Sequence, residues 1–258
     1  MRKASRRPFY HDFAWAYEYI IDAPLAERCA FIERVIRGAL AQARPRLLDA
    51  GCGPGHYSAA LAQRGFQVVG LDSSEDFVRQ AQDTYGQGMN APQFLHGDIL
   101  HLGDLAPFDA ILCRGVLNDL LDPVERQRVF HEFARALNPG GLLLFDVRDW
   151  TKTVERIEQR PEFLKTVATD RGTLTFHSAT ILDFPARQMR IHEYHHLQSR
   201  GGESKQAYDF VMQCWTHEEV AEWLYAARFQ IVQELGAYDE RVVSGATDRM
   251  VIYARLLA

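Results

Sequence analysis

Apolar and polar positions change their spacing along the chain, and the changes divide it into parts. Residues 24–42 carry apolar side chains at helical spacing, which predicts an amphipathic helix. Short apolar runs then alternate with helical stretches. They predict strands at 46–51, 66–72, 92–99, 108–115 and 141–147, and helices at 54–64, from Ser73 or Ser74 to Gln82, and at 123–137. Strands that are apolar throughout are typical of a parallel sheet with helices on both faces.

The second half begins with a different period. Residues 173–184, 187–198 and 205–215 alternate polar and apolar side chains, which predicts antiparallel strands. A helix then begins at Thr216, and strands at 229–235 and 250–256 resume the earlier pattern. We therefore expect an α/β fold with a doubly wound, mostly parallel seven-stranded sheet and an inserted antiparallel β cap. The expected boundaries are 1–43 for an N-terminal helical lid, 44–150 for the core, 151–214 for the cap and 215–258 for completion of the core.

Composition narrows the class of protein. The 258 residues carry a net charge of −5, which is not the basic footprint of a nucleic-acid binder. The sequence has no run of about 18 apolar residues, so we expect no membrane span. The basic N-terminus is not followed by an apolar segment, so we expect no secretory signal. The four cysteines are widely spaced, which argues against a zinc site and a disulfide framework. We expect a cytoplasmic protein with reduced thiols.

The most informative stretch is "LLDAGCGPGHYS" at residues 47–58, where a buried strand runs into Gly51, Gly53 and Gly55. A strand that ends in a glycine-rich turn and opens a helix is the geometry of a nucleotide site. An acidic residue at the end of the next strand can take both ribose hydroxyls, and Asp72 stands there.

Two residues argue against a dinucleotide as the ligand. The dinucleotide fingerprint needs a glycine where this chain has His56. Asp49 would repel a pyrophosphate but would attract an ammonium group. The pattern therefore favours a ligand with an amine where a dinucleotide has phosphates, such as S-adenosylmethionine.

The motifs "LLDAGCGPG", "VVGLD", "HGDI", "FDAILCRGVLNDL" and "LNPGGLLLFDV" occur in this order. In them the chain resembles the class I S-adenosylmethionine-dependent methyltransferases, strongly over about residues 45–150 and more loosely over the last two strands. The resemblance implies methyl transfer to nitrogen or oxygen of a small-molecule metabolite, with S-adenosylhomocysteine as product and no metal. It makes 44–150 the cofactor-binding core and 151–214 the substrate cap.

The resemblance also implies the residues of the cofactor site. The glycine loop lies under the methionine part, Asp49 supports its ammonium group, Asp72 holds the ribose hydroxyls and Asp98 takes the adenine amino group. Ser73 and Ile99 border the ligand, and two residues contribute backbone at the end of the fourth strand. The full set is Tyr17, Asp49, Gly51, Gly53, Gly55, Asp72, Ser73, Asp98, Ile99, Cys113 and Arg114.

The N-terminal stretch "YHDFAWAYEYI" looks like the segment that closes over the cofactor in many small-molecule methyltransferases. Tyr10 and Tyr17 occupy the matching places, and aromatic rings stabilise a nearby sulfonium. The alternative is a packed amphipathic helix that uses Phe13, Trp15 and Tyr17 as core anchors.

Candidates for the acceptor site lie in two further places. An amine nucleophile needs only to arrive deprotonated, whereas a hydroxyl needs a base. Asn118 stands where relatives often have a histidine. On the strand "RIHEYHH", alternation places Arg190, His192, Tyr194 and His196 on one face. The weak candidates for catalysis are His192, Tyr194 and His196, and those for substrate binding are Tyr10, Asn118, Arg148, Tyr194 and His196.

Interpretations of the same residues that involve no binding or catalysis also stay open. The polar face of the strand can simply face solvent, and Arg148 and Asp149 can form a surface ion pair. Neighbours on one strand face lie about 7 Å apart, so these histidines are not expected to form a metal site. Alternative functions are a methyltransferase acting on a nucleic acid or protein, a dinucleotide-dependent reductase, and a non-catalytic cofactor-binding protein. The cap of about fifty residues favours a partly enclosed pocket for a metabolite.

Overall fold

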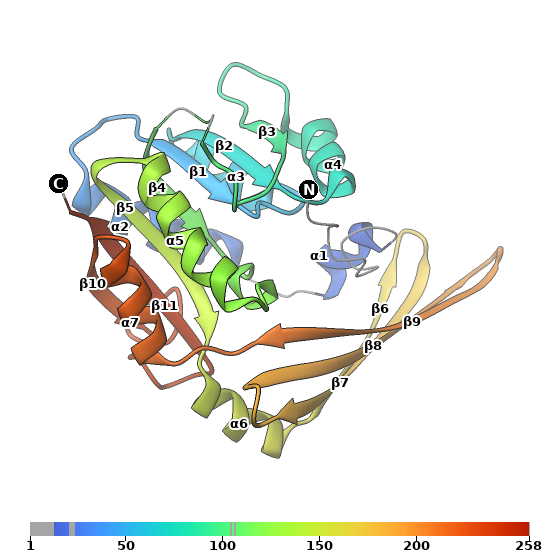
Figure 1. Cartoon of the computed structure of the whole chain (residues 1–258). Coiled ribbons are helices and arrows are strands. Elements are labelled where there is room, and N and C mark those ends of the chain that lie inside the picture. The colour runs from blue at the N-terminus through green and yellow to red at the C-terminus, as the bar shows by residue number, and fades with distance from the viewer. Residues whose placement is uncertain (1–12, 21–23, 104, 106, 258) are drawn as a thin grey trace.

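A seven-stranded sheet forms the centre of the protein, as seen in a computed structural model that describes residues 13–20, 24–103, 105 and 107–257. Its strand order is β10-β11-β5-β4-β1-β2-β3, and β11 alone runs antiparallel to the other six strands (Figure 1). The strands are β1 (Arg46–Ala50), β2 (Gln67–Asp72), β3 (Gln93–His96), β4 (Phe108–Cys113), β5 (Leu137–Arg148), β10 (Phe229–Leu235) and β11 (Arg249–Leu256).

Helices cover both faces of this sheet. On one face α2 (Leu25–Ala39) and α3 (His56–Gln63) bury apolar side chains such as Ile32 and Leu61 against Leu47 and Leu144. On the other face α5 (Pro123–Ala136) and α7 (His217–Ala226) bury Phe130 and Leu224 against the sheet. The remaining core helix, α4 (Glu75–Tyr85), packs beside β3. The prediction of a doubly wound, mostly parallel sheet is confirmed.

The element boundaries differ from the expected ones in small ways. Of the two candidate caps for α4, Ser74 is the one used, since its hydroxyl accepts the N–H of Phe77 at 3.2 Å. Thr216 caps α7 in a reciprocal capping box with Glu219. The strand β5 begins at Leu137, so the Asn-Pro-Gly-Gly segment belongs to its first part rather than standing outside it.

A four-stranded antiparallel sheet forms the inserted cap, as predicted, and lies across the carboxyl edge of the core (Figure 1). Its strands are β6 (Glu162–Thr169), β7 (Gly172–Asp183), β8 (Gln188–Ser199) and β9 (Gly202–Gln213). Two elements were not predicted. The helix α6 (Trp150–Gln159) begins at Asp149, whose carboxylate accepts the N–H of Lys152 at 2.7 Å. The strand β6 buries none of its residues, so its sequence carries little hydrophobic signal.

The described part of the N-terminal segment forms a short 3-10 helix, η2 (Ala14–Ala16), and α1 (Tyr17–Ile20), which lie against the cap. Phe13 and Ile20 pack with Leu174 and Phe176 in one apolar cluster, and Trp15 packs against that cluster. For Phe13 and Trp15 the anchoring alternative is therefore observed. Tyr10 and the side chain of Tyr17 lie outside the described residues, so their expected contacts with cofactor and substrate stay predictions. Among the described helices none is long and apolar enough to cross a membrane.

Candidate cofactor and acceptor site

The glycine loop leaves the end of β1 and is tied to the end of β2. The N–H groups of Gly51 and Cys52 both donate to the carbonyl of Leu71, at 2.7 and 3.0 Å. All three glycines are left-handed, with φ of +80° at Gly51, +55° at Gly53 and +87° at Gly55. Glycine adopts this conformation without the steric cost that a side chain would bring. The loop therefore depends on its glycines for its shape.

Two of these glycines differ in what surrounds them. A Cβ at Gly55 would lie 2.8 Å from the Cβ of Ala81 and 2.9 Å from the ring of Phe94, so this position is filled by packing. A Cβ at Gly53 would meet no atom of the described residues within 4 Å. The backbone at Gly53 thus borders open space at the carboxyl edge of the sheet, where ligands of open α/β sheets bind.

Asp72 connects the loop to the start of α4. Its Oδ2 accepts the N–H of Gly53 and its Oδ1 accepts the N–H of Ser74, both at 2.8 Å. Burial raises the pKa of this carboxyl, and the two N–H groups offset part of that effect. Each carboxylate oxygen has a second lone pair, so Asp72 can still accept two hydroxyl groups. The neighbouring Ser73 is exposed.

Asp49 lies deeper, near the end of β1, and is 2% exposed. The hydroxyl of Ser58 donates to its Oδ2 at 2.6 Å. Burial raises the pKa of the Asp49 carboxyl, while the charge of Arg114 and the bond from Ser58 lower it. A cation next to Asp49 would be stabilised, because a buried carboxylate without a counter-charge is costly.

The loop after β3 completes this edge. The N–H of Gly97 donates to the carbonyl of Asp72 at 2.9 Å, which brings the "HGDI" segment beside the glycine loop. The Oδ1 of Asp98 accepts the N–H of Leu100 at 2.9 Å, and Ile99 is 8% exposed. The structure therefore brings Asp49, Asp72 and Asp98 to one edge of the sheet.

Cys113 and Arg114 follow at the end of β4. Cys113 is fully buried, and burial raises the pKa of its thiol well above the ordinary value of 9.0. It packs in the core of the sheet with Ile111 and Phe145. Arg114 was expected to contribute backbone only, but its side chain lies over Tyr57, with Cζ 3.2 Å from the ring centroid. The sequence shows an arginine at the end of the strand, in the "CRG" triplet. It does not show that the Arg114 side chain packs on Tyr57.

Two expected substrate contacts make other contacts in the structure. Asn118, in the 3-10 helix η3 (Leu117–Asp119), is buried, and its amide Nδ2 donates to the carbonyl of Gln213 at 2.6 Å. Arg148 forms an ion pair with Asp248, which also pairs with Arg156 at 2.7 Å. Arg148 is therefore in an ion pair, but its partner is Asp248 and not the neighbouring Asp149, whose carboxylate caps α6.

The cap strand β8 has an inner and an outer face. The inner face carries Met189, Ile191, Glu193 and His195, all of them buried. Phe13 packs on it at one end, with its ring centroid 4.6 Å from that of His195. At the other end Met189 and Ile191 pack with Cys214, where the cap joins the core.

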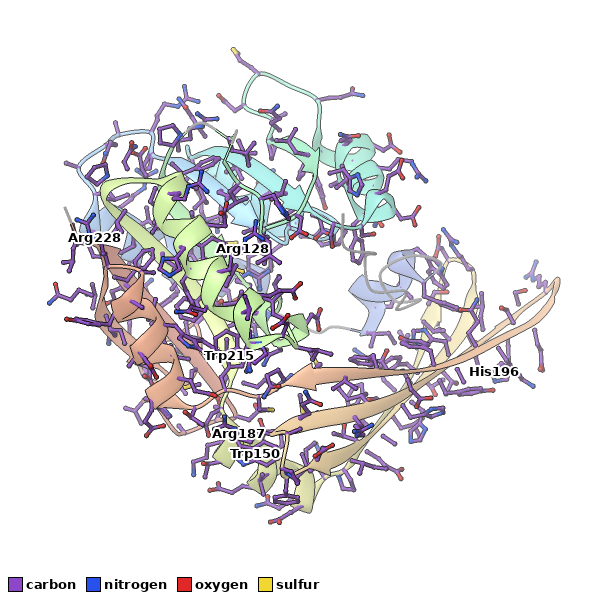
Figure 2. All side chains as sticks on the ribbon, viewed as in Figure 1. Arg128, Trp150, Arg187, His196, Trp215 and Arg228 are labelled. Carbon is purple, nitrogen blue, oxygen red and sulfur yellow. The ribbon has the colours of Figure 1, made fainter. Side chains whose placement is uncertain are left out.

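The face of β8 that was expected to bind substrate is the more exposed one, as in the solvent-facing alternative, and its contact with an acceptor stays a prediction. The outer face carries Arg190, His192, Tyr194 and His196, and Figure 2 shows His196 far from the junction with the core at Trp215. His192 and His196 pair there with Asp209 and Glu203, at 2.9 and 3.3 Å. The alternation was right, but both faces carry polar side chains, so it could not show which one turns toward the core. In the described part of the chain, no group of three His, Cys, Asp or Glu side chains could hold a metal ion.

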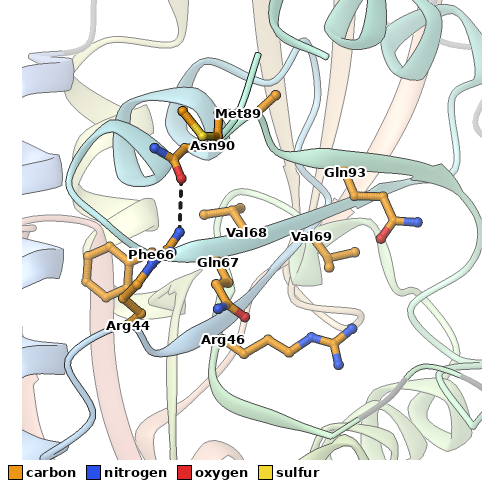
Figure 3. A pocket seen from close by; sticks show the side chains of 10 residues that line it. Arg44, Arg46, Phe66, Gln67, Val68, Val69, Met89, Asn90 and Gln93 are labelled. Carbon is orange, nitrogen blue, oxygen red and sulfur yellow. Dashed lines mark hydrogen bonds between the residues drawn. The ribbon is translucent and has the colours of Figure 1, made fainter. Parts of the chain in front are cut away.

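A hollow of about 330 Å³ lies elsewhere, at the amino ends of β1, β2 and β3 (Figure 3). Arg44, Arg46, Gln67 and Gln93 line it, and Arg44 donates to Asn90 at 3.0 Å. Because ligands of open α/β sheets bind at the carboxyl ends of the strands, this hollow is on the wrong edge for the site described above.

Comparison with known proteins agrees with this geometry. A family described as a methyltransferase domain matches residues 47–141, the stretch that contains the glycine loop and the ends of β2, β3 and β4. A protein of Geobacillus sp. (strain WCH70), named as a methyltransferase, is 27% identical over 255 residues, which cover 95% of this chain and 99% of that protein.

Solved structures show the same fold over nearly the whole chain. An S-adenosylmethionine-dependent methyltransferase from Clostridium acetobutylicum superposes with a TM-score of 0.78 at 16% identity, covering 96% of this chain and 99% of its own. An amino pentose methyltransferase from Micromonospora echinaspora gives a TM-score of 0.73 at 20% identity, covering 95% and 96%. The matched domain, the full-length relative and the shared fold all point to a class I S-adenosylmethionine-dependent methyltransferase, and none of the three points to a dinucleotide-dependent reductase.

Proposed function

We propose that this protein transfers a methyl group from S-adenosylmethionine to a nitrogen or oxygen atom of a small-molecule metabolite. The observation that carries the proposal is the bond from the Gly53 N–H to Asp72, at 2.8 Å, beside open space at Gly53. This arrangement holds a carboxylate where ribose hydroxyls can reach it and leaves the backbone uncovered for the rest of the ligand. The residues present therefore fit the cofactor.

In this proposal each acidic residue of the edge has one role. Asp72 accepts the ribose hydroxyls, Asp98 accepts from the adenine amino group, and Asp49 supports the ammonium group of the methionine part. The three loop glycines let the backbone approach that part closely. The bound cofactor supplies a methyl group already activated by a positive sulfur, so the protein must mainly align the acceptor and exclude water.

The inner face of the cap carries polar side chains that can contact a small acceptor. Glu193 is 3% exposed and His195 is fully buried. Tyr208 donates its hydroxyl to Glu193, and the Nε2 of His195 lies 3.1 Å from the same hydroxyl and 3.9 Å from the carboxylate. Buried polar networks cost stability unless they are fully satisfied, and they are common at functional sites. We place the acceptor's polar contacts at this cluster of Glu193, His195 and Tyr208.

The cluster suits both kinds of acceptor atom. A carboxylate can bind a protonated amine and take its proton, and a His-Tyr-Glu chain can take a proton from a hydroxyl. The likeness to an amino pentose methyltransferase is one of fold alone, so both atoms stay in the proposal.

Calorimetric titration with S-adenosylhomocysteine tests the cofactor half of the proposal. The wild type is expected to bind S-adenosylhomocysteine with micromolar affinity and not to bind NAD. Asp72→Ala should abolish the binding of S-adenosylhomocysteine. The matched control is Asp83→Ala, an exposed acid on α4, which should bind as the wild type does. Clear NAD binding without S-adenosylhomocysteine binding would overturn the proposal.

The acceptor half is tested once screening of amine and hydroxyl metabolites has given a substrate. Glu193→Gln keeps the shape and removes the charge, and it should raise KM for the acceptor at least tenfold. His192→Gln, one position away on the outer face, should leave KM and kcat unchanged. Equal effects of the two variants would contradict the assignment to the inner face.

A further inference from the structure

Arg114 lies beside the glycine loop and has no ion-pair partner among the described residues. Its Nε is buried and has no hydrogen-bond partner, and no carboxylate among the described residues lies within ion-pair distance of its guanidinium. Arginine stays protonated in proteins, so this charge cannot be lost by titration. A buried guanidinium that lacks a partner carries a desolvation cost that an anionic ligand would offset.

Aromatic rings hold the guanidinium in place. Its Cζ lies 3.2 Å from the ring centroid of Tyr57, on the first turn of α3, and 5.9 Å from that of Tyr238. Both rings belong to the face of the sheet that α2 and α3 cover. Stacking of this kind fixes the plane of a guanidinium while its edge remains available for hydrogen bonds.

The two carboxylates with the strongest electrostatic influence on Arg114 have other partners. Asp49 accepts the Ser58 hydroxyl at 2.6 Å. Asp146 pairs with Arg249 at 2.6 Å and accepts the hydroxyl of Tyr238 at 2.6 Å. Asp146 also accepts the N–H of Gly115, the residue after Arg114, at 3.1 Å. The network therefore fixes the backbone at the end of β4 but leaves the guanidinium unpaired.

Arg114 and Asp49 stand on neighbouring strands at the same edge. In the parallel pair of β1 and β4, Asp49 is opposite Leu112, so Arg114 follows just beyond the level of Asp49. A cation and an anion placed there match the two charges of an amino-acid group, one carboxylate and one ammonium. A planar guanidinium binds a carboxylate through two parallel N–H bonds.

We propose that Arg114 binds the carboxylate of the methionine part of the cofactor, opposite Asp49, which takes the ammonium group. This inference rests on the proposed use of S-adenosylmethionine. It makes Arg114 a specificity residue, because a nucleotide that lacks an amino-acid carboxylate leaves the guanidinium unpaired. Neither the family match nor the motif at the end of β4 assigns this role to the side chain.

The test compares two probes by calorimetry. One is S-adenosylhomocysteine, and the other is its decarboxylated form, which keeps the ammonium group and lacks the carboxylate. Each is titrated into the wild type, Arg114→Met and Arg128→Met. Methionine keeps much of the length over Tyr57, and Arg128 is an exposed arginine on α5 that serves as the matched control.

The wild type should bind S-adenosylhomocysteine about 10- to 100-fold more tightly than the decarboxylated probe, as expected for a charge-assisted hydrogen-bonded pair. Arg114→Met should lose that preference by weakening only the first probe, and Arg128→Met should keep it. Thermal unfolding reports whether each variant is folded.

Three results would overturn the inference. If Arg114→Met lowers the affinity for both probes equally, the side chain only supports the loop. If it lowers the affinity for neither probe, the carboxylate of the cofactor binds elsewhere. If the wild type binds neither probe, the proposed cofactor site itself fails, and the assignment of Arg114 fails with it.

Discussion

The amide of Asn118 donates to the backbone carbonyl of Gln213 over 2.6 Å, and this bond joins the core to the cap. Asn118 follows β4 at the carboxyl edge, while Gln213 is the last residue of β9. The side chain of Gln213 continues the junction, with its Nε2 within 3.1 Å of the carbonyls of Ala186 and Arg187. The position of the cap over the site therefore depends on two buried amide side chains.

Removing this amide should loosen the junction. Asn118→Ala leaves the Gln213 carbonyl buried without its donor, and we expect a loss of about 1–3 kcal/mol in the free energy of unfolding. Asn118→Asp should lose more, because a carboxylate would face a carbonyl. The exposed Gln127→Ala on α5 is the control and should change little. Chemical denaturation of the three variants measures the order, and an Asp variant as stable as the wild type would contradict it.

The two loop glycines offer a second contrast. Gly55→Ala should destabilise the fold by roughly 2–4 kcal/mol, because it combines positive φ with overpacking against Ala81 and Phe94. Gly53→Ala meets no neighbour, so it should cost only the roughly 1 kcal/mol of its positive φ.

The affinity for S-adenosylhomocysteine should rank the same two variants in the opposite order, with the larger loss in Gly53→Ala. The methyl group of Gly53→Ala projects into the space where the ligand would lie, so its affinity for S-adenosylhomocysteine should fall at least tenfold while the protein stays folded. Thermal unfolding and calorimetry on one preparation give both quantities. Full affinity in Gly53→Ala would show that the ligand does not approach this backbone.

Much of the core could be predicted because its signals are local. A left-handed turn after a buried strand requires glycines, and a capping box at Thr216 and Glu219 marks a helix start. The faces of the cap could not be ranked in this way. Glu193 and His195 look as polar as His192 and His196 in the sequence, and only packing under Phe13 and beside the core decides which pair is buried.

The role of the Arg114 side chain was hidden for a similar reason. Its orientation depends on Tyr57 from the helix after the glycine loop and on Tyr238 near the C-terminus. Neither partner is near Arg114 in the sequence, so no spacing pattern relates them. Non-local contacts of this kind need the folded sheet to bring them together.

Asp49 and Asp146 should show opposite pH dependences. Burial raises the pKa of Asp49 above its ordinary value of 3.8. Its contribution to stability is therefore full below pH 3.8 and is lost as the pH rises through the folded-state pKa. Asp49→Asn should then be more stable than the wild type at neutral pH and should bind S-adenosylhomocysteine more weakly.

For Asp146 burial also opposes ionisation, but Arg249, Tyr238 and Arg114 outweigh it and lower the pKa below 3.8. This contribution is present above pH 3.8 and is lost as the pH falls through the folded-state pKa. Asp146→Asn should cost about 3–5 kcal/mol at neutral pH, the usual effect of breaking a buried ion pair. Denaturation of the wild type and both variants between pH 2 and 8 measures how each carboxyl changes the dependence of stability on pH, and changes of the same sign would contradict the assignment.

Arg126 gives the last prediction, in a place where a charge is buried without an evident use. It lies on α5, 6% exposed, with its Cζ 5.6 Å from the ring centroid of Trp215 and 5.1 Å from that of Trp223. Its Nε and Nη1 have no hydrogen-bond partner among the described residues, and burial lowers its pKa. The cation–π contacts, worth about 2 kcal/mol when desolvated, oppose the cost of the two unpaired donors.

Replacing Arg126 with methionine should remove the cost of the unpaired donors and keep the packing on the two tryptophans. Arg126→Met keeps the contact area with both tryptophans and removes the unpaired donors, so it should be at least as stable as the wild type. Arg126→Ala should lose about 2–3 kcal/mol, because it leaves a cavity between the rings. Thermal and chemical unfolding of the pair decide the point. If methionine is as destabilising as alanine, the guanidinium charge itself holds α5 against α7, and the two cation–π contacts outweigh the unpaired donors.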